Sequence, residues 1–206
     1  STSTRAFGLY LTPIGSVAVA EDGTLFVVDT FNDRILGFRQ VPEVDNASAD
    51  FVVGKQGLSS PITSTTSRNE LSRPLSVSTA NGQMAVVDGN RVLIYATVPA
   101  SDGPPASIVV GQSTFTATAS LGCTQSGLDN PHSAVLTRNG KLVVADSDQH
   151  RVLIWNSVPQ SNGQPADVVL GQSDFLHCTE NNGSSPAANT LAKPFGLWSD
   201  GHRLIV

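Results

Sequence analysis

The chain has 206 residues, of which 39% are hydrophobic and 14% charged, and it carries a formal net charge of -5. A chain of this length can bury a core, and its acidic balance without a basic run predicts no nucleic-acid partner. The apolar runs are much shorter than a membrane span, and residues 1–20 show no charged-then-apolar leader.

The first predicted unit follows Pro13 and consists of strands and turns. Val, Ile and Thr favour strands over helices, while 18 glycines and 12 prolines favour turns. Asp22-Gly23 suits a tight hairpin turn, because both positions accept positive φ. Strands are expected near residues 14–20, 24–29, 34–39 and 50–54.

The pattern of the first unit recurs twice and begins a fourth time. Asp29, Asp88 and Asp146 each close a second strand and stand 59 and 58 residues apart. A period near sixty residues predicts a repeat architecture. Further strands are expected near residues 75–79, 83–88, 91–96 and 107–111, and then near 132–137, 141–146, 151–156 and 167–171.

Each repeat contains four antiparallel strands followed by a long connection, which is the description of a propeller blade. We therefore expect an all-β protein, a β-propeller segment of about three and a half four-stranded blades in an open arc. The predicted blades are residues 13–56, 74–112 and 131–172, with a half blade at 194–206.

The repeat resembles that of bacterial NHL-repeat β-propeller proteins. In that family a proline precedes the first strand, a pattern like Val-Ala-Asp follows, and an Asn-His-Arg-Val turn leads into the third strand. Ala145-Asp146 and His150-Arg151-Val152 match this pattern. Asp33 replaces the histidine in the first copy, and the second copy, Asp88-Gly89-Asn90-Arg91, is two residues shorter, which predicts a tighter turn. The resemblance implies a propeller fold and leaves the function open.

An aspartate and an arginine flank the same turn in every repeat. Because catalytic groups usually break the symmetry of a repeat, a structural role is favoured over a ring of acid–base groups. A carboxylate there can accept backbone N–H bonds, and a guanidinium can bridge to a neighbour. The predicted structural residues are Asp29, Asp88, Asp146, Arg34, Arg91 and Arg151.

Three residues that break the repeat are the candidates for ligand contact. His132 follows a proline where Leu75 and Phe195 stand in other repeats, so it is expected beside the central channel. Trp198 has no counterpart in the other first strands, and His177 lies in a long loop. Because the histidines lack metal-ligand spacing, we assign no metal, no cofactor and no catalytic residue.

Aromatic and hydroxyl side chains receive structural interpretations. Phe38, Tyr95 and Trp155 share one repeat position and are expected to fill the gaps between blades. Ser16 and Ser76, near first strands, are interpreted as polar lining of the channel.

Cys123 and Cys178 are the only cysteines and fall in the long loops of successive repeats. Two readings stay open: a disulfide, which requires Cα atoms within about 7 Å, and two unrelated thiols. A disulfide would predict a secreted, periplasmic or cell-surface protein.

Two function classes remain after these exclusions. The first is a non-enzymatic binding or scaffolding module that recognises a protein or glycan through the long loops on one face. The alternative is a channel-centred, metal-dependent hydrolase or lyase, resembling lactonases or amidating lyases. Several acidic and histidine side chains converging on the channel would favour the enzyme.

The fourth repeat runs to Val206, and in the other repeats the aspartate follows the hairpin glycine by six residues, so the aspartate that corresponds to Gly201 is expected one residue beyond Val206. Such an arc would leave apolar blade surface open to water. We therefore expect a fragment of a longer propeller that self-associates through its open ends.

Overall fold

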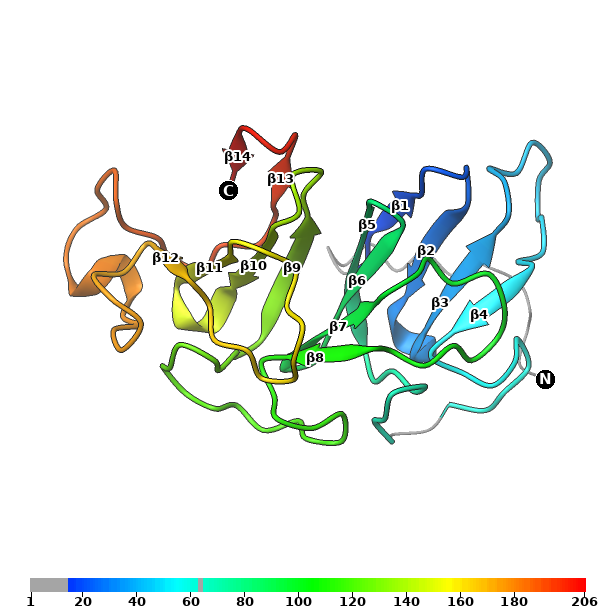
Figure 1. Ribbon diagram of the computed structural model, residues 1–206, viewed down its shortest axis with the longest axis horizontal. Coiled ribbons are helices and arrows are strands. Elements are labelled where there is room, and N and C mark those ends of the chain that lie inside the picture. The colour runs from blue at the N-terminus through cyan, green and yellow to red at the C-terminus, as the bar shows by residue number, and fades with distance from the viewer. Residues whose placement is uncertain (1–14, 63–64) are drawn as a thin grey trace.

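The computed structural model describes residues 15–62 and 65–206, and this part of the chain is all β. Three four-stranded sheets and one two-stranded sheet follow one another in an open arc (Figure 1). Its only helical elements are short 3-10 turns: η1 (Thr30–Asn32), η2 (Ser147–Gln149) and η3 (Glu180–Gly183).

Each four-stranded sheet is an antiparallel meander in sequence order, as in a propeller blade. Blade 1 contains β1 (Val17–Val19), β2 (Leu25–Asp29), β3 (Arg34–Phe38) and β4 (Phe51–Val53). Blade 2 contains β5 (Pro74–Ala80), β6 (Gln83–Asp88), β7 (Arg91–Tyr95) and β8 (Ile108–Val110). Blade 3 contains β9 (Pro131–Leu136), β10 (Leu142–Asp146), β11 (Arg151–Trp155) and β12 (Val168–Leu170). The pair β13 (Trp198–Ser199) and β14 (Leu204–Ile205) follows.

The predicted fold class is confirmed: the described chain is an open β-propeller segment. Apart from β1, every predicted strand in the three blades begins and ends within one residue of its observed position. The strand β1 begins at Val17 instead of residue 14, and Pro13 with Ile14 lies outside the described residues. The hairpin between β5 and β6 has Asn81 and Gly82 at φ 52° and 71°, which is why Asn-Gly suits this turn.

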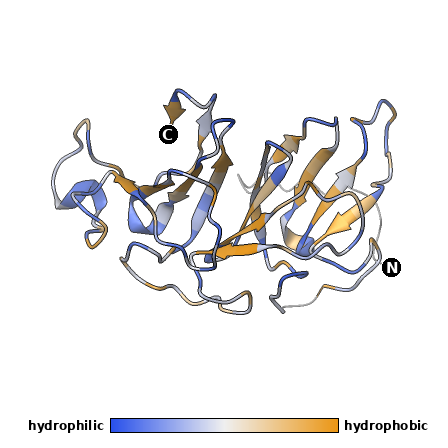
Figure 2. Cartoon of the chain, in the orientation of Figure 1, coloured by the Kyte–Doolittle hydropathy of each residue, from blue (hydrophilic) through white to orange (hydrophobic). Residues whose placement is uncertain are grey.

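The apolar core lies between successive blades, not within one sheet. Between blades 1 and 2, Phe26 and Phe51 pack with Val86 and Leu93, and the two phenylalanine rings meet edge to face at 6.0 Å. Figure 2 shows hydrophobic residues along the strands and hydrophilic residues along most connections. Tyr95 belongs to this cluster, as the repeat position predicts.

A second cluster joins blades 2 and 3 in the same way. Val87 and Val110 of blade 2 pack with Val144, Leu153 and Trp155 of blade 3. All five side chains are fully buried. Stacked blades of this kind bury a continuous core that a single four-stranded sheet could not form alone.

A close glycine–leucine contact explains the glycine at the end of each fourth strand. Gly54 has φ 89°, and a Cβ there would lie 2.5 Å from the side chain of Leu71. Gly111 meets Leu128 in the same manner. Only glycine accepts both this φ and this contact, so the long connection returns tightly against the blade that it leaves.

Polar contacts between neighbouring blades supplement the core. The Ser16 hydroxyl accepts a bond of 2.8 Å from the Val77 N–H, and Ser78 accepts one of 2.8 Å from the Leu136 N–H. The interpretation of Ser16 as simple channel lining is therefore incomplete, because its hydroxyl joins two blades. The connection between β7 and β8 also reaches back, since the Asp102 carboxylate accepts a bond of 2.8 Å from the Val52 N–H of blade 1.

The two ends of each blade carry different connections. In Figure 1 the hairpins β1–β2 and β5–β6 lie along the upper edge of the arc, and the described parts of the crossing loops, residues 54–62, 65–73 and 111–130, run along the lower edge. The turns that join β2 to β3 and β6 to β7 lie at the same end as these loops. We call this end the loop face.

Candidate functional site

The repeated aspartate and arginine form an ion pair beside the turn of each blade. The distances are 2.8 Å for Arg34–Asp29, 2.7 Å for Arg91–Asp88 and 2.8 Å for Arg151–Asp146. In blades 2 and 3 both side chains are fully buried, whereas in blade 1 the Asp29 side chain is 24% exposed. The same pair of side chains therefore meets at nearly the same distance in each of the three blades.

Each arginine also holds the crossing loops in place. Arg91 donates to the carbonyls of Glu70, in the loop that enters blade 2, and of Phe115, in the loop that leaves it. Arg151 likewise donates to the carbonyls of Gly127 and Phe175, each at 3.0 Å. One buried guanidinium therefore anchors two loops to its blade.

Burial of these carboxyls affects their protonation. Burial raises the pKa of Asp88 to about 6, although Arg91 and the Ser72 N–H both favour the charged form. Burial raises the pKa of Asp146 to about 6 as well, against the attraction of Arg151. Because both carboxyls are enclosed and fully bonded, we interpret these pKa values as consequences of packing.

The residue before each arginine joins its blade to the next one. Asp33 accepts a bond of 2.8 Å from the N–H of Arg73, which directly precedes the proline of blade 2. Asn90 accepts one of 2.8 Å from the N–H of Asn130, before blade 3. His150 Nδ1 accepts the equivalent bond of 3.2 Å from Lys193. The histidine of the repeat therefore accepts a hydrogen bond from the next blade, and an aspartate or asparagine at the same position accepts the same bond.

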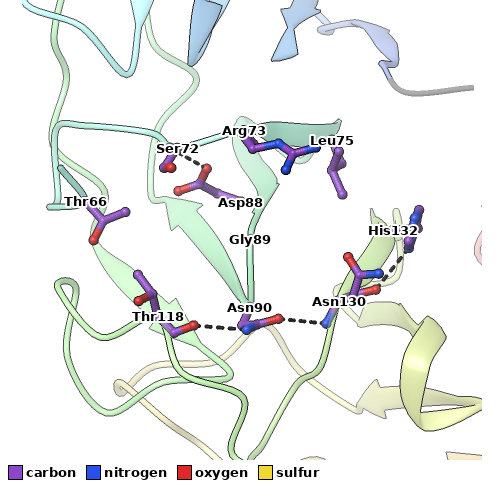
Figure 3. A pocket seen from close by; sticks show the side chains of 10 residues that line it. All are labelled: Thr66, Ser72, Arg73, Leu75, Asp88, Gly89, Asn90, Thr118, Asn130 and His132. Atoms are coloured by element: carbon purple, nitrogen blue, oxygen red, sulfur yellow. Dashed lines mark hydrogen bonds between the residues drawn. The ribbon is translucent and has the colours of Figure 1, made fainter. Parts of the chain in front are cut away.

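The shorter turn of blade 2 lies beside a cavity. This cavity has a volume of about 470 Å3. It opens on the loop face between the turn of blade 2 and the residues that enter blades 2 and 3 (Figure 3). Its lining is Thr66, Ser72, Arg73, Leu75, Asp88, Gly89, Asn90, Thr118, Asn130 and His132.

A smaller cavity of about 220 Å3 adjoins the inner strands. Leu75 and His132 line both cavities. The His132 ring packs against Phe195 with ring centroids 4.1 Å apart, and its Nδ1 lies 3.0 Å from the Asn130 carbonyl. The structure therefore places His132 between the two cavities.

The other two candidate residues lie away from both cavities. Trp198 is 50% exposed on β13, and His177 is exposed in the loop after β12. His177 Nδ1 lies 2.7 Å from the Asp174 carboxylate. The structure does not bring His132, Trp198 and His177 together in one cavity. Within residues 15–62 and 65–206, no group of three or more His, Cys, Asp or Glu could hold a metal ion.

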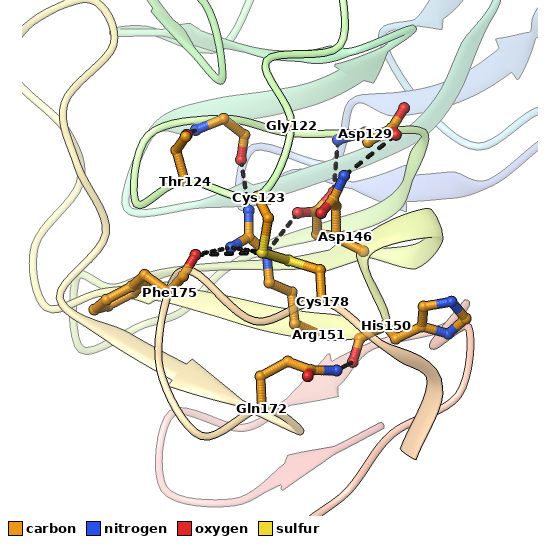
Figure 4. Close-up of polar contacts among 12 residues, drawn as sticks. Gly122, Cys123, Thr124, Asp129, Asp146, His150, Arg151, Gln172, Phe175 and Cys178 are labelled. Atoms are coloured by element: carbon orange, nitrogen blue, oxygen red, sulfur yellow. Dashed lines mark hydrogen bonds and ion pairs between the residues drawn. A yellow bond between two sulfur atoms is a disulfide. The ribbon is translucent and has the colours of Figure 1, made fainter. Parts of the chain in front are cut away.

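The sulfurs of Cys123 and Cys178 are bonded, with Cα atoms 5.9 Å apart (Figure 4). This disulfide links the loop that enters blade 3 to the loop that leaves it. Arg151 Nη1 lies 4.0 Å from the Cys123 sulfur, so a covalent link and a guanidinium fix the same two loops.

Comparison with known proteins gives one family match. Residues 128–155, which contain β9, β10 and β11, match the NHL repeat. This part of blade 3 is an NHL-type repeat. Among curated proteins, no significant sequence match was found. In the part of the chain that the structure describes, no helix is long and apolar enough to cross a membrane.

Two solved structures are similar at low sequence identity. Kuenenia stuttgartiensis hydrazine synthase is 10% identical over 73% of this chain and 35% of that chain, with a TM-score of 0.41. U3-55K is 12% identical over 78% of this chain and 53% of that chain, with a TM-score of 0.35. The chain thus spans about a third and about half of these proteins. At these TM-scores, neither similarity supports an argument about function.

Sequence reasoning missed most of the residues around the larger cavity. The sequence did not indicate Arg73 or Asn130, because the residue before the proline differs from one repeat to the next. The signal was the missing pair of residues in the turn Asp88-Gly89-Asn90-Arg91. It predicted a tighter turn, but not the cavity beside it.

Proposed function

We propose that this chain is a non-enzymatic binding module of a bacterial NHL-repeat propeller protein, and that it recognises a protein or glycan partner through its loop face. The single observation that carries this proposal is the rigid attachment of sequence-variable loops around a cavity. Buried arginines fix the loops, and the cavity of about 470 Å3 lies among them. Variable loops on a rigid scaffold are a common location of binding specificity.

The loops differ in sequence although their anchors repeat. Arg34, Arg91 and Arg151 donate to the carbonyls of Leu58, Phe115 and Phe175, each 24 residues further along the chain. Beyond these anchors the three loops share little sequence and carry many Ser, Thr, Asn and Gly. A constant scaffold with varied polar tips suits recognition of a partner better than it suits a repeated chemical reaction.

The disulfide supports a location for this activity. Because disulfides persist in oxidising compartments, we propose that the protein is secreted, periplasmic or exposed on the cell surface.

An array of defined glycans and peptides tests the proposed function. We expect a binder whose addition slows amide hydrogen exchange in the loops 55–73, 113–130 and 172–193. The control region is the opposite edge, including the hairpin at Asn81-Gly82. Protection confined to that edge, or no binder on an array that includes charged and neutral members, would contradict the proposal.

Self-association stays a prediction with its own test. Val17 and Val19 of β1 are 65% and 55% exposed, and Trp198 and Ile205 of the last pair are 50% and 61% exposed. Apolar side chains at the two ends of the arc could cover one another in a second copy. Light scattering at increasing concentration should show masses above 21.5 kDa, and a constant monomer would contradict the prediction.

A further inference from the structure

Blade 2 lacks a turn that blades 1 and 3 share. In blade 1, η1 follows Asp29, and the Thr30 hydroxyl donates a bond of 2.7 Å to the Pro74 carbonyl of the next blade. In blade 3, η2 follows Asp146, and the Ser147 hydroxyl donates to the Pro194 carbonyl. Only two residues separate the aspartate from the arginine in blade 2, and neither carries a hydroxyl.

The larger cavity borders the place where these turn residues are missing. Gly89 follows Asp88 directly and has φ 60°, and apart from Gly89 itself and its two chain neighbours no described residue has an atom within 4 Å of the position that its Cβ would occupy. Gly89 and Asn90 both line the cavity. The shortened turn therefore opens space on the loop face, at a point where blades 1 and 3 have a 3-10 turn.

The available charge in this cavity is positive. Asp88 is fully buried, and its oxygens accept bonds from the Ser72 N–H and from Arg91. Arg73 is exposed, and its guanidinium makes no hydrogen bond or ion pair with any residue that the structure describes. Its backbone N–H is bonded to Asp33, so the main chain is fixed while the charged group faces the cavity (Figure 3).

The rest of the lining offers neutral hydrogen-bonding groups and a small apolar surface. The Ser72, Thr66 and Thr118 side chains supply hydroxyls, and Asn130 supplies an amide. Leu75 continues the wall toward the smaller cavity. A volume of about 470 Å3 lies within the range of about 300–1,000 Å3 that is usual for small-molecule sites.

We infer that this cavity binds an acidic saccharide, with Arg73 paired to the carboxylate of a uronic acid unit and the hydroxyl and amide side chains bonded to the sugar hydroxyls. A guanidinium fits a carboxylate through two parallel hydrogen bonds. The described lining offers several hydroxyl groups and one charged side chain without a partner, Arg73, which matches a sugar unit with one carboxylate better than it matches a densely charged ligand. The inference rests on the proposed function and names its ligand class.

Calorimetric titration with tri-galacturonate and with the neutral galactose trisaccharide tests the inference. We expect the acidic sugar to bind at least about tenfold more tightly, because a charge-assisted hydrogen bond is roughly twice as strong as a neutral one and a tenfold change in affinity corresponds to about 1.4 kcal/mol. Raising the salt concentration should weaken the binding of the acidic sugar and leave the binding of the neutral sugar unchanged. Equal affinities for the two sugars would overturn the inference.

Two variants locate the site. Arg73→Gln should weaken tri-galacturonate binding about tenfold or more, whereas Arg138→Gln, at the exposed hairpin at the opposite end of β9, should leave it unchanged. Replacing residues 89–90 by the four-residue sequence found at 147–150 should restore the longer turn, fill the cavity and abolish binding. Thermal unfolding of each variant checks that the fold is kept. Unchanged affinity in both Arg73→Gln and the longer-turn variant would also overturn the inference.

The possible outcomes separate this inference from the proposed function. If an acidic peptide or a neutral glycan binds the loop face and tri-galacturonate does not, the inference fails and the proposed function stands. If no saccharide or peptide slows hydrogen exchange in the loops, both fail.

Discussion

The same aspartate–arginine motif has different surroundings in blade 1 from those that it has in blades 2 and 3. In blades 2 and 3 the incoming loop covers the ion pair, because the N–H groups of Ser72 and Asp129 donate to Asp88 and Asp146. In the described part of blade 1, Asp29 receives its bonds from Arg34 and from the exposed Asn32. The comparison teaches that one sequence motif can be a fully enclosed ion pair or a partly hydrated one, depending on its loops.

This difference sets the expected energetic cost of removing a charge. A buried ion pair contributes little net stability compared with an apolar pair, but loss of one partner leaves a buried charge without compensation. A partly hydrated pair can exchange its lost partner for water. The same substitution should therefore have unequal effects in the two settings.

Arg91→Ala is expected to produce the largest effect. It leaves Asp88 buried without its partner and frees two loops, so the free energy of unfolding should fall by about 3–5 kcal/mol. Arg34→Ala, beside the 24% exposed Asp29, should cost about 1–2 kcal/mol. Urea denaturation of both variants measures the difference, and equal losses would refute the distinction between the blades.

The disulfide gives a second difference between blades, because it links the two loops beside blade 3. Cys123→Ser together with Cys178→Ser opens a link across 55 residues, and the free energy of unfolding should fall by about 2–4 kcal/mol. Hydrogen exchange should increase in the two loops around blade 3, while the loop between blades 1 and 2 stays unchanged. Equal exchange in all loops of the double variant would show that Arg151 alone fixes them.

The sequence was sufficient to predict the fold because local signals repeat. Asn-Gly and Asp-Gly turns, short apolar runs and a constant spacing place eleven of the twelve blade strands within one residue. The period also predicts the contact between Tyr95 and the neighbouring blade, since residues at one repeat position meet the same surroundings. Such agreement between local and global signals is expected for a repeat protein.

The candidate site was much less predictable, because it depends on contacts between blades. No local pattern indicates that the N–H of Arg73 bonds Asp33, 40 residues earlier, or that its guanidinium has no partner among the residues that the structure describes. His132 was noticed because it breaks the repeat, and it does line the cavity. Trp198 also breaks the repeat, yet it lies on the exposed strand β13. Loss of symmetry therefore identifies candidates, and only the three-dimensional arrangement separates them.

The buried carboxyls should also produce a pH dependence. For Asp88 the pKa is about 6 in the folded protein, compared with about 3.9 in an unfolded chain, so the folded state binds the proton more tightly. Its contribution to stability is present below about pH 4 and is lost as the pH rises through about 6. The unfolding free energy of the wild type minus that of Asp88→Asn should therefore increase as the pH falls from 6 to 4. If this difference decreased instead, the attraction of Arg91 would lower the pKa of Asp88 by more than burial raises it.

Tyr95→Phe is expected to give the smallest effect and the opposite sign. Phe38, Tyr95 and Trp155 share one repeat position, but only Tyr95 and Trp155 carry a polar side-chain atom, and these two atoms differ in their hydrogen bonding. Trp155 Nε1 donates a bond of 2.9 Å to the Gln164 carbonyl, whereas the buried Tyr95 hydroxyl has no hydrogen-bond partner among the described residues. Burial raises the pKa of this hydroxyl, so it stays uncharged.

An enclosed hydroxyl without a partner costs free energy that the unfolded chain recovers from water. Replacing Tyr95 by Phe, the residue that blade 1 already has at this position, should therefore leave the protein equally stable or more stable by up to about 1 kcal/mol. Trp155→Phe should instead destabilise it by more than about 1 kcal/mol, since it removes both a satisfied hydrogen bond and part of a large buried ring. Thermal and urea unfolding of the two variants measure the pair. A clear loss of stability in Tyr95→Phe would show that the hydroxyl has a bonded partner, such as a buried water, between blades 1 and 2.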